Sequence, residues 1–120
     1  SDLLVGDDTE ANRKLLAWML EDDGHEVIEA VDGQDALTQC EAAAPDVVLL
    51  DWNMPIMSGM EFLQALSSAK MTARPKIIFC TTENGISHIK AAVDAGADEY
   101  VMKPFDHETL QIKLQLVGMA

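Results

Sequence analysis

Five short apolar clusters, spaced regularly along the chain, constrain its fold more than any other feature. They begin roughly 20 to 30 residues apart, which is the length that a strand, a helix and two connections occupy. The clusters are Leu3–Val5, Val27–Ile28, Val47–Leu50, Ile77–Phe79 and Tyr100–Met102. The run Val47–Leu50 has no polar alternation, as is typical of strands that are buried on both faces. The clusters therefore predict five buried strands.

Apolar residues at helical spacing lie between and after these clusters. The five stripes contain Leu15, Leu16, Met19 and Leu20; Ala36, Leu37, Cys40 and Ala44; Phe62, Leu63 and Leu66; Ile86, Ile89 and Val93; and Leu110, Leu114 and Val117. Ser58 and Glu61 match a capping box at the start of the third stripe, and Asp106 is an N-cap candidate for the fifth. The alternation predicts an α/β fold of the (βα)5 type, in which helices cover both faces of a doubly wound, five-stranded parallel sheet. A length of 120 residues fits a single domain, residues 1–120.

The net charge of −13 excludes several classes of partner. Nucleic acid and anionic membrane surfaces both carry phosphates that would repel such a chain. The sequence has no signal segment and no apolar run near the roughly 20 residues that a membrane helix needs. Cys40 and Cys80 lack the CxxC spacing of redox or zinc motifs. We therefore expect a cytoplasmic protein with reduced thiols, acting on neither nucleic acid nor membrane.

Polar side chains follow four of the five predicted strands. Asp7 and Asp8 follow the first, Asp51 ends the third, Thr81 follows the fourth and Lys103 the fifth. The carboxyl ends of parallel strands meet at one edge of the sheet, where ligands bind. Three carboxylates, a hydroxyl and an ammonium are thus predicted to converge.

These residue types fit phosphoryl transfer. Neighbouring carboxylates repel one another and lose hydration near a core, so they favour a bound cation. Carboxylate oxygens are ligands that Mg²⁺ prefers, and a carboxylate such as Asp51 can attack a phosphoryl group to form an aspartyl phosphate. Mg²⁺, Lys103 and the Thr81 hydroxyl would neutralise the phosphoryl oxygens.

The combination of Asp7 with Asp8, Asp51 in "LLDWNMPIMSG", Thr81, and Lys103 in "KPF" resembles the receiver domain of two-component response regulators. The resemblance covers essentially the whole chain. It implies a flavodoxin-like sheet with the strand order 2-1-3-4-5. It also implies that the protein is no conventional enzyme, because a receiver catalyses only its own phosphorylation and dephosphorylation.

The resemblance assigns the chemistry to particular residues. Asp51 would accept a phosphoryl group from a histidine kinase. Asp8 would bind Mg²⁺ directly, with Mn²⁺ as an alternative ion. Asp7 would act mainly through a metal-bound water, and the backbone carbonyl of Asn53 would complete the metal ligands.

The resemblance also implies a switch. Lys103 and Thr81 would each hold a phosphoryl oxygen, and Tyr100 would move inward as Thr81 moves, which shifts the population between two packings. Asn53 and Glu83 would tune the lifetime of the aspartyl phosphate. Pro104 would follow a cis peptide bond.

The stretches "FCTTEN" and "GADEYVMKPFD" are similar to the CheY proteins of alphaproteobacteria. They favour a stand-alone, monomeric chemotaxis regulator with a CheA-like kinase and an output protein such as a flagellar motor switch component. Alternatives are a phosphate sink for a shared kinase and a receiver fragment of a larger regulator. A Mg²⁺-dependent phosphohydrolase is less favoured, because such enzymes place a second acid where this chain has Asn53.

Two residues near the acids raise further expectations. Gly6 stands where receivers carry a larger apolar residue, and a glycine there is expected to loosen the end of the strand. Trp52, next to Asp51, is expected to be half-buried and to report metal binding.

Overall fold

A five-stranded parallel sheet forms the centre of the protein. The computed structural model describes residues 2–52, 54, 56–69, 74–82 and 86–119. The strands are β1 (Asp2–Gly6), β2 (Glu26–Ala30), β3 (Val47–Asp51), β4 (Lys76–Thr82) and β5 (Glu99–Lys103). They lie in the order β2-β1-β3-β4-β5, and neighbouring strands run parallel. The five predicted strands and the flavodoxin-like order are confirmed.

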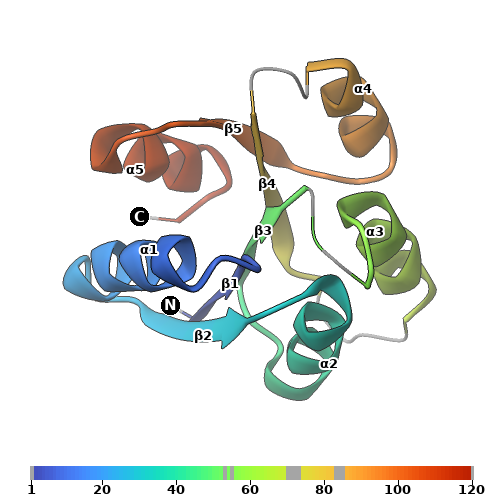
Figure 1. Cartoon of the computed structure of the whole chain (residues 1–120), viewed down its shortest axis with the longest axis horizontal. Coiled ribbons are helices and arrows are strands. Elements are labelled where there is room, and N and C mark those ends of the chain that lie inside the picture. Colours follow the sequence, from blue (N-terminus) through green and yellow to red (C-terminus); the bar gives the residue numbers. More distant parts are fainter. Residues whose placement is uncertain (1, 53, 55, 70–73, 83–85, 120) are drawn as a thin grey trace.

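Helices cover both faces of this sheet. They are α1 (Glu10–Asp22), α2 (Gly33–Ala43), α3 (Gly59–Ser68), α4 (Ile86–Asp94) and α5 (His107–Leu116). Figure 1 shows α1 and α5 together on one face, and α2, α3 and α4 on the other. The doubly wound prediction is therefore confirmed.

Alternate residues of the central strands build two separate cores. In β1, Leu3 and Val5 pack with Leu16 of α1 and Leu110 of α5, whereas Leu4 packs on the other face with α2 and α3. Side chains of a strand point alternately to its two faces, so burial on both sides requires apolar residues at every position. This explains the unbroken apolar run of β3.

Helix starts follow the predicted caps. The Ser58 hydroxyl accepts a hydrogen bond from the Glu61 backbone N–H at 3.2 Å, and the Glu61 carboxylate accepts one from the Ser58 N–H at 3.1 Å. The Asp106 carboxylate accepts from the Thr109 N–H at 2.8 Å. Asp32 is the N-cap of α2 and accepts from the Asp35 N–H at 2.7 Å. The capping box at α3 and the N-cap of α5 are confirmed.

Some residues of the helical stripes are more exposed than the pattern predicts. Leu15 is 57% exposed, although its neighbour Leu16 is buried. A helix advances by 3.6 residues per turn, so two adjacent residues cannot both face the sheet centre. Cys40 and Cys80 are buried and free, as expected. Among the helices of the described ranges, none combines the length and apolarity needed to cross a bilayer.

Candidate functional site

Three carboxylates meet at the carboxyl edge of the sheet. β1 and β3 are neighbours, with Gly6 opposite Leu50, so the residues that follow Gly6 lie beside Asp51. One carboxylate oxygen from each of Asp7, Asp8 and Asp51 lies within 4.8 Å of the other two. The sequence predicted this convergence, and the strand register explains it. Three oxygens at this separation form a set of hard ligands that suits a small divalent cation.

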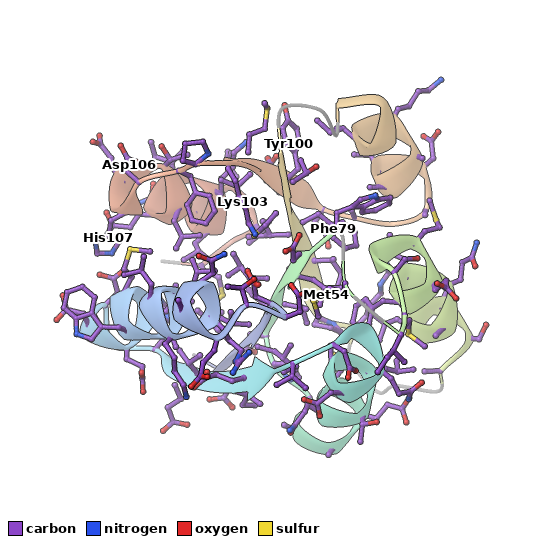
Figure 2. The ribbon with its side chains drawn as sticks, in the orientation of Figure 1. Met54, Phe79, Tyr100, Lys103, Asp106 and His107 are labelled. Carbon is purple, nitrogen blue, oxygen red and sulfur yellow. The ribbon has the colours of Figure 1, made fainter. Side chains whose placement is uncertain are left out.

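Lys103 connects two of these acids from the end of β5 (Figure 2). Its ammonium group donates to Asp7 Oδ2 at 3.2 Å and to Asp51 Oδ2 at 3.1 Å. Burial by itself lowers the pKa of Lys103, but the negative charges of Asp51 and Asp7 outweigh burial and hold the pKa above its ordinary value. Lys103 therefore carries its positive charge at neutral pH. The peptide bond between Lys103 and Pro104 is cis, as expected.

The three acids lie in different environments. Asp7 is 1% exposed, Asp51 is half-buried, and Asp8 is exposed. Both Asp7 carboxylate oxygens accept hydrogen bonds, since Oδ1 accepts from the Thr9 N–H at 2.8 Å and Oδ2 from Lys103. Asp8 is thus the acid that solvent reaches most easily, whereas Asp7 is held in the protein.

Thr81 and Tyr100 occupy the neighbouring strands β4 and β5. Thr81 is buried, and Tyr100, opposite Phe79, is half-buried. The ammonium of Lys113 lies 4.6 Å from the centre of the Tyr100 ring and also donates to Glu99 at 3.1 Å. A cation over the face of an aromatic ring attracts it, so α5 holds the ring of Tyr100 in its present orientation.

Trp52 is more deeply buried than expected. Its ring packs edge-on against Phe79, with ring centres 4.9 Å apart and planes at 85°. Gly59 permits this packing, because a Cβ at that position would lie 2.8 Å from Trp52 Cε3. The expectation of a half-buried ring was wrong because sequence cannot show that Phe79 and Gly59 enclose it. Trp52 nonetheless adjoins Asp51 directly.

A cavity of about 420 Å³ opens beside Asp7 and Lys103. Its walls come from α1 and from the segment after β5, and they include the apolar side chains Leu15, Leu16 and Phe105. The acidic edge is therefore accessible from the side of α1. Cys80 below Lys103 adds no charge, because burial raises the pKa of its thiol to about 12.

Comparison with known proteins agrees with this geometry. Residues 3–115 match the family described as the response regulator receiver domain. The chain belongs to this family. It is 37% identical over 117 residues to the chemotaxis protein CheY1 of Helicobacter pylori, covering 96% of this chain and 94% of CheY1.

Two solved structures have the same fold as this chain. The chemotaxis regulator CheY4 of Vibrio cholerae superposes with a TM-score of 0.87 at 35% identity, covering 98% of both chains. The receiver domain of the sensor histidine kinase PA1611 of Pseudomonas aeruginosa has a TM-score of 0.86 at 25% identity, covering 98% of this chain and 97% of that one. Its structure has a magnesium ion coordinated in the active-site cleft. The chain is thus a CheY-like receiver of two-component signalling.

The structure corrects the expectation about Gly6. Gly6 is buried, and a Cβ there would lie 2.4 Å from Leu50 Cδ1 and 3.3 Å from Met54 Cε. The space that a larger residue would fill is therefore already occupied by Leu50. The absence of a side chain at Gly6 therefore leaves room for Leu50. The strand β1 is not loosened, because its pairing with β2 and β3 extends through Gly6.

Sequence reasoning missed Arg13 and Glu29. Arg13 lies on the buried face of α1, with its side chain 10% exposed, and pairs with Glu29 of β2 at 3.1 Å. It also donates to the backbone carbonyl of Asp7 at 2.9 Å. The signal was present, because Arg13 precedes Leu16 and Leu20 at helical spacing and so lies on the apolar face. Asn53 and Glu83, which were assigned roles from the resemblance, lie outside the described residues.

Proposed function

We propose that the whole chain, residues 1–120, acts as one receiver domain that accepts a phosphoryl group on Asp51 from a histidine kinase in a Mg²⁺-dependent reaction. One observation carries the proposal. Asp7, Asp8 and Asp51 converge within 4.8 Å, and Lys103 bridges Asp7 and Asp51. This constellation combines a nucleophile, a set of cation ligands and a fixed positive charge.

The donor set fits a magnesium ion. Asp8 would bind the ion directly because it is the exposed acid, and Asp51 would share it. Asp7 would act through a metal-bound water, since both of its carboxylate oxygens already accept hydrogen bonds. The Asn53 carbonyl is the further ligand that the family resemblance implies. When bound, Mg²⁺ or Mn²⁺ would neutralise phosphoryl oxygens during transfer.

The chain's own groups perform the transfer. A carboxylate oxygen of Asp51 attacks the phosphorus of a phosphohistidine, an O–P bond forms, and the P–N bond breaks with its electron pair going to the imidazole nitrogen. Lys103, already 3.1 Å from Asp51 Oδ2, then holds one phosphoryl oxygen. Its raised pKa keeps the ammonium charged throughout. Thr81 in the neighbouring strand would hold a second oxygen.

We further propose that phosphorylation changes the surface around Tyr100, and that the output is chemotaxis. The likeness to CheY1 and CheY4 supports this role, with a CheA-like kinase and a flagellar motor switch component as the expected partners. Inward movement of Tyr100 would have to release its contact with Lys113. The exchange Tyr100→Ala should therefore weaken phosphorylation-dependent partner binding, and unchanged affinity would rule out this surface.

Phosphotransfer is tested by incubation with a small-molecule phosphodonor and Mg²⁺, followed by intact mass spectrometry. We expect one phosphoryl group on the wild type and on the control Asp22→Asn, and none on Asp51→Asn. Equal modification of wild type and Asp51→Asn would refute the assignment. Turnover of a small phosphate ester should be negligible, because Asn53 replaces the acid that a phosphohydrolase needs. A phosphate sink would show the same phosphorylation without partner binding.

A further inference from the structure

We propose that Arg13 is a positioning residue for the acidic site, and that Glu29 in turn holds Arg13. The proposal rests on the Mg²⁺-dependent function proposed above. It assigns a role to two residues on α1 and β2: Arg13 donates to the backbone of Asp7, and Glu29 accepts from Arg13. Arg13 acts through the backbone of Asp7, to which it donates at 2.9 Å.

Arg13 is enclosed to a degree that is unusual for arginine. Its side chain is 10% exposed, and it donates from Nη1 to the Asp7 carbonyl and from Nε to Glu29 Oε1. A buried guanidinium is costly unless its donors and its charge are both matched. Its planar fork suits two partners at fixed angles better than the single ammonium of lysine. Arg13 therefore links α1, the end of β1 and the edge strand β2 in one fixed arrangement.

Asp7 is the residue that needs such support. It follows Gly6, the last residue of β1, at which the pairing with β2 and β3 ends. Its N–H donates to the Ala30 carbonyl at 3.2 Å, and its carbonyl accepts from Arg13. Because hydrogen bonds hold both the N–H and the carbonyl of Asp7, the backbone position from which its carboxylate reaches Lys103 is fixed. A small rotation of this peptide would move the carboxylate, and misplacement of about 1 Å is costly at such sites.

Charge and position predict opposite effects of removing Arg13. By Coulomb's law, loss of a cation near a cation site should tighten Mg²⁺ binding. Loss of a residue that positions Asp7 should weaken it, by about tenfold as for other groups that orient metal ligands. The sign of the change therefore separates the two effects. Lys14 provides the matched control, because it donates to the same Glu29 at 2.9 Å from an exposed position.

The experiment compares Arg13→Met and Lys14→Met, which lose the same charge from adjacent residues. Mg²⁺ affinity is measured by titration calorimetry, the phosphorylation rate at saturating Mg²⁺ by intact mass spectrometry, and folding by thermal unfolding. We expect a dissociation constant about tenfold higher for Arg13→Met and close to the wild-type value for Lys14→Met. We expect saturating Mg²⁺ to recover most of the phosphorylation rate, because the defect lies in binding.

A folded Arg13→Met protein that binds Mg²⁺ as well as or better than the wild type would overturn the proposal, as would an equal loss in Lys14→Met. If Arg13→Met does not fold, Arg13→Lys keeps the charge beside Glu29 without the planar fork. It should still weaken Mg²⁺ binding, and wild-type affinity would overturn the proposal. Failure of the proposed function itself is recognised separately, because the wild type would then show no Mg²⁺-dependent phosphorylation.

Discussion

Two pairs of adjacent aspartates occur in this chain, and they have different surroundings. Asp7 and Asp8 follow strand β1, where Asp7 is 1% exposed and accepts from Lys103. Asp22 and Asp23 end helix α1 and are exposed. The Asp23 carboxylate lies 2.7 Å from His107 Nε2, at the start of α5 (Figure 2). The same dipeptide thus forms part of a cluster of three acids in one place and a solvent-exposed helix end in the other.

The difference comes from what the fold places beside each pair. Parallel strands bring a third acid, Asp51, and a lysine to the first pair, whereas the second pair has a histidine and Gln111 nearby on α5. Charges that are concentrated and partly desolvated interact strongly, whereas exposed ones are screened. The local sequence "DD" therefore carries little functional information until its position in the sheet is known.

The test with the largest expected effect replaces the side chain that contacts each pair, Lys103 for the first and His107 for the second. Lys103→Met should slow phosphorylation of Asp51 by about 10²- to 10³-fold, since it removes a fixed charge that stabilises the transition state. His107→Gln should leave the rate unchanged, because that contact lies at the exposed helix end. Both rates are measured by intact mass spectrometry at saturating Mg²⁺. A wild-type rate in Lys103→Met would show that the lysine beside the first pair matters no more for phosphorylation than the histidine beside the second.

The second test replaces one aspartate of each pair with asparagine. Asp8→Asn should weaken Mg²⁺ binding by about tenfold or more, because a direct carboxylate ligand is lost. Asp22→Asn removes the same charge from a helix end and should bind Mg²⁺ as the wild type does. Calorimetric titration provides both constants. Equal affinities would mean that the acids at the end of β1 are not the cation site.

A third test uses pH. The pKa of Lys103 lies above its ordinary value of 10.5 in the folded protein. A raised pKa means that the charged lysine stabilises the fold fully below about pH 10.5, and that this stabilisation is lost as the pH rises through the higher folded pKa. Urea unfolding should show a steeper alkaline decline in stability for wild type and His107→Gln than for Lys103→Met. Identical slopes of stability against pH would show that Asp51 and Asp7 do not raise the pKa of Lys103.

The smallest effect is spectroscopic. Trp52 adjoins Asp51, whereas Trp18 is exposed and lies one helical turn before Asp22. Addition of Mg²⁺ should change the fluorescence of Trp18→Phe, in which Trp52 remains, and should leave that of Trp52→Phe nearly unchanged. A metal response from Trp18 alone would contradict the placement of the site.

Much of the site followed from the order of residues along the chain. Asp7, Asp8, Asp51 and Lys103 all lie within three residues after an apolar cluster, and parallel strands gather such residues at one edge. The strand order that makes β4 and β5 neighbours, with Thr81 on one and Tyr100 on the other, was implied by the resemblance to receiver domains. The helix caps at Ser58 and Asp106 depend on contacts within four residues, so sequence alone identified them.

Contacts between distant residues were beyond this reasoning. The deep burial of Trp52 could not be predicted, because nothing near it in sequence shows that Phe79 will pack against it. Gly6 had no explanation until Leu50 was found to fill the space beside it. Arg13 carried a visible signal on the apolar face of α1, yet its partners, Glu29 and the Asp7 carbonyl, became evident in three dimensions.

The sequence by itself determined the alternation of strands and helices, the doubly wound sheet and the residues at its carboxyl edge, because periodicity and strand direction are local properties of the chain. Tertiary structure decided how those residues divide their roles. Burial and hydrogen bonds distinguish the enclosed Asp7 from the exposed Asp8, and the charges around Lys103 set its pKa. These quantities depend on which groups lie within a few ångströms of one another, and packing rather than sequence order sets those distances.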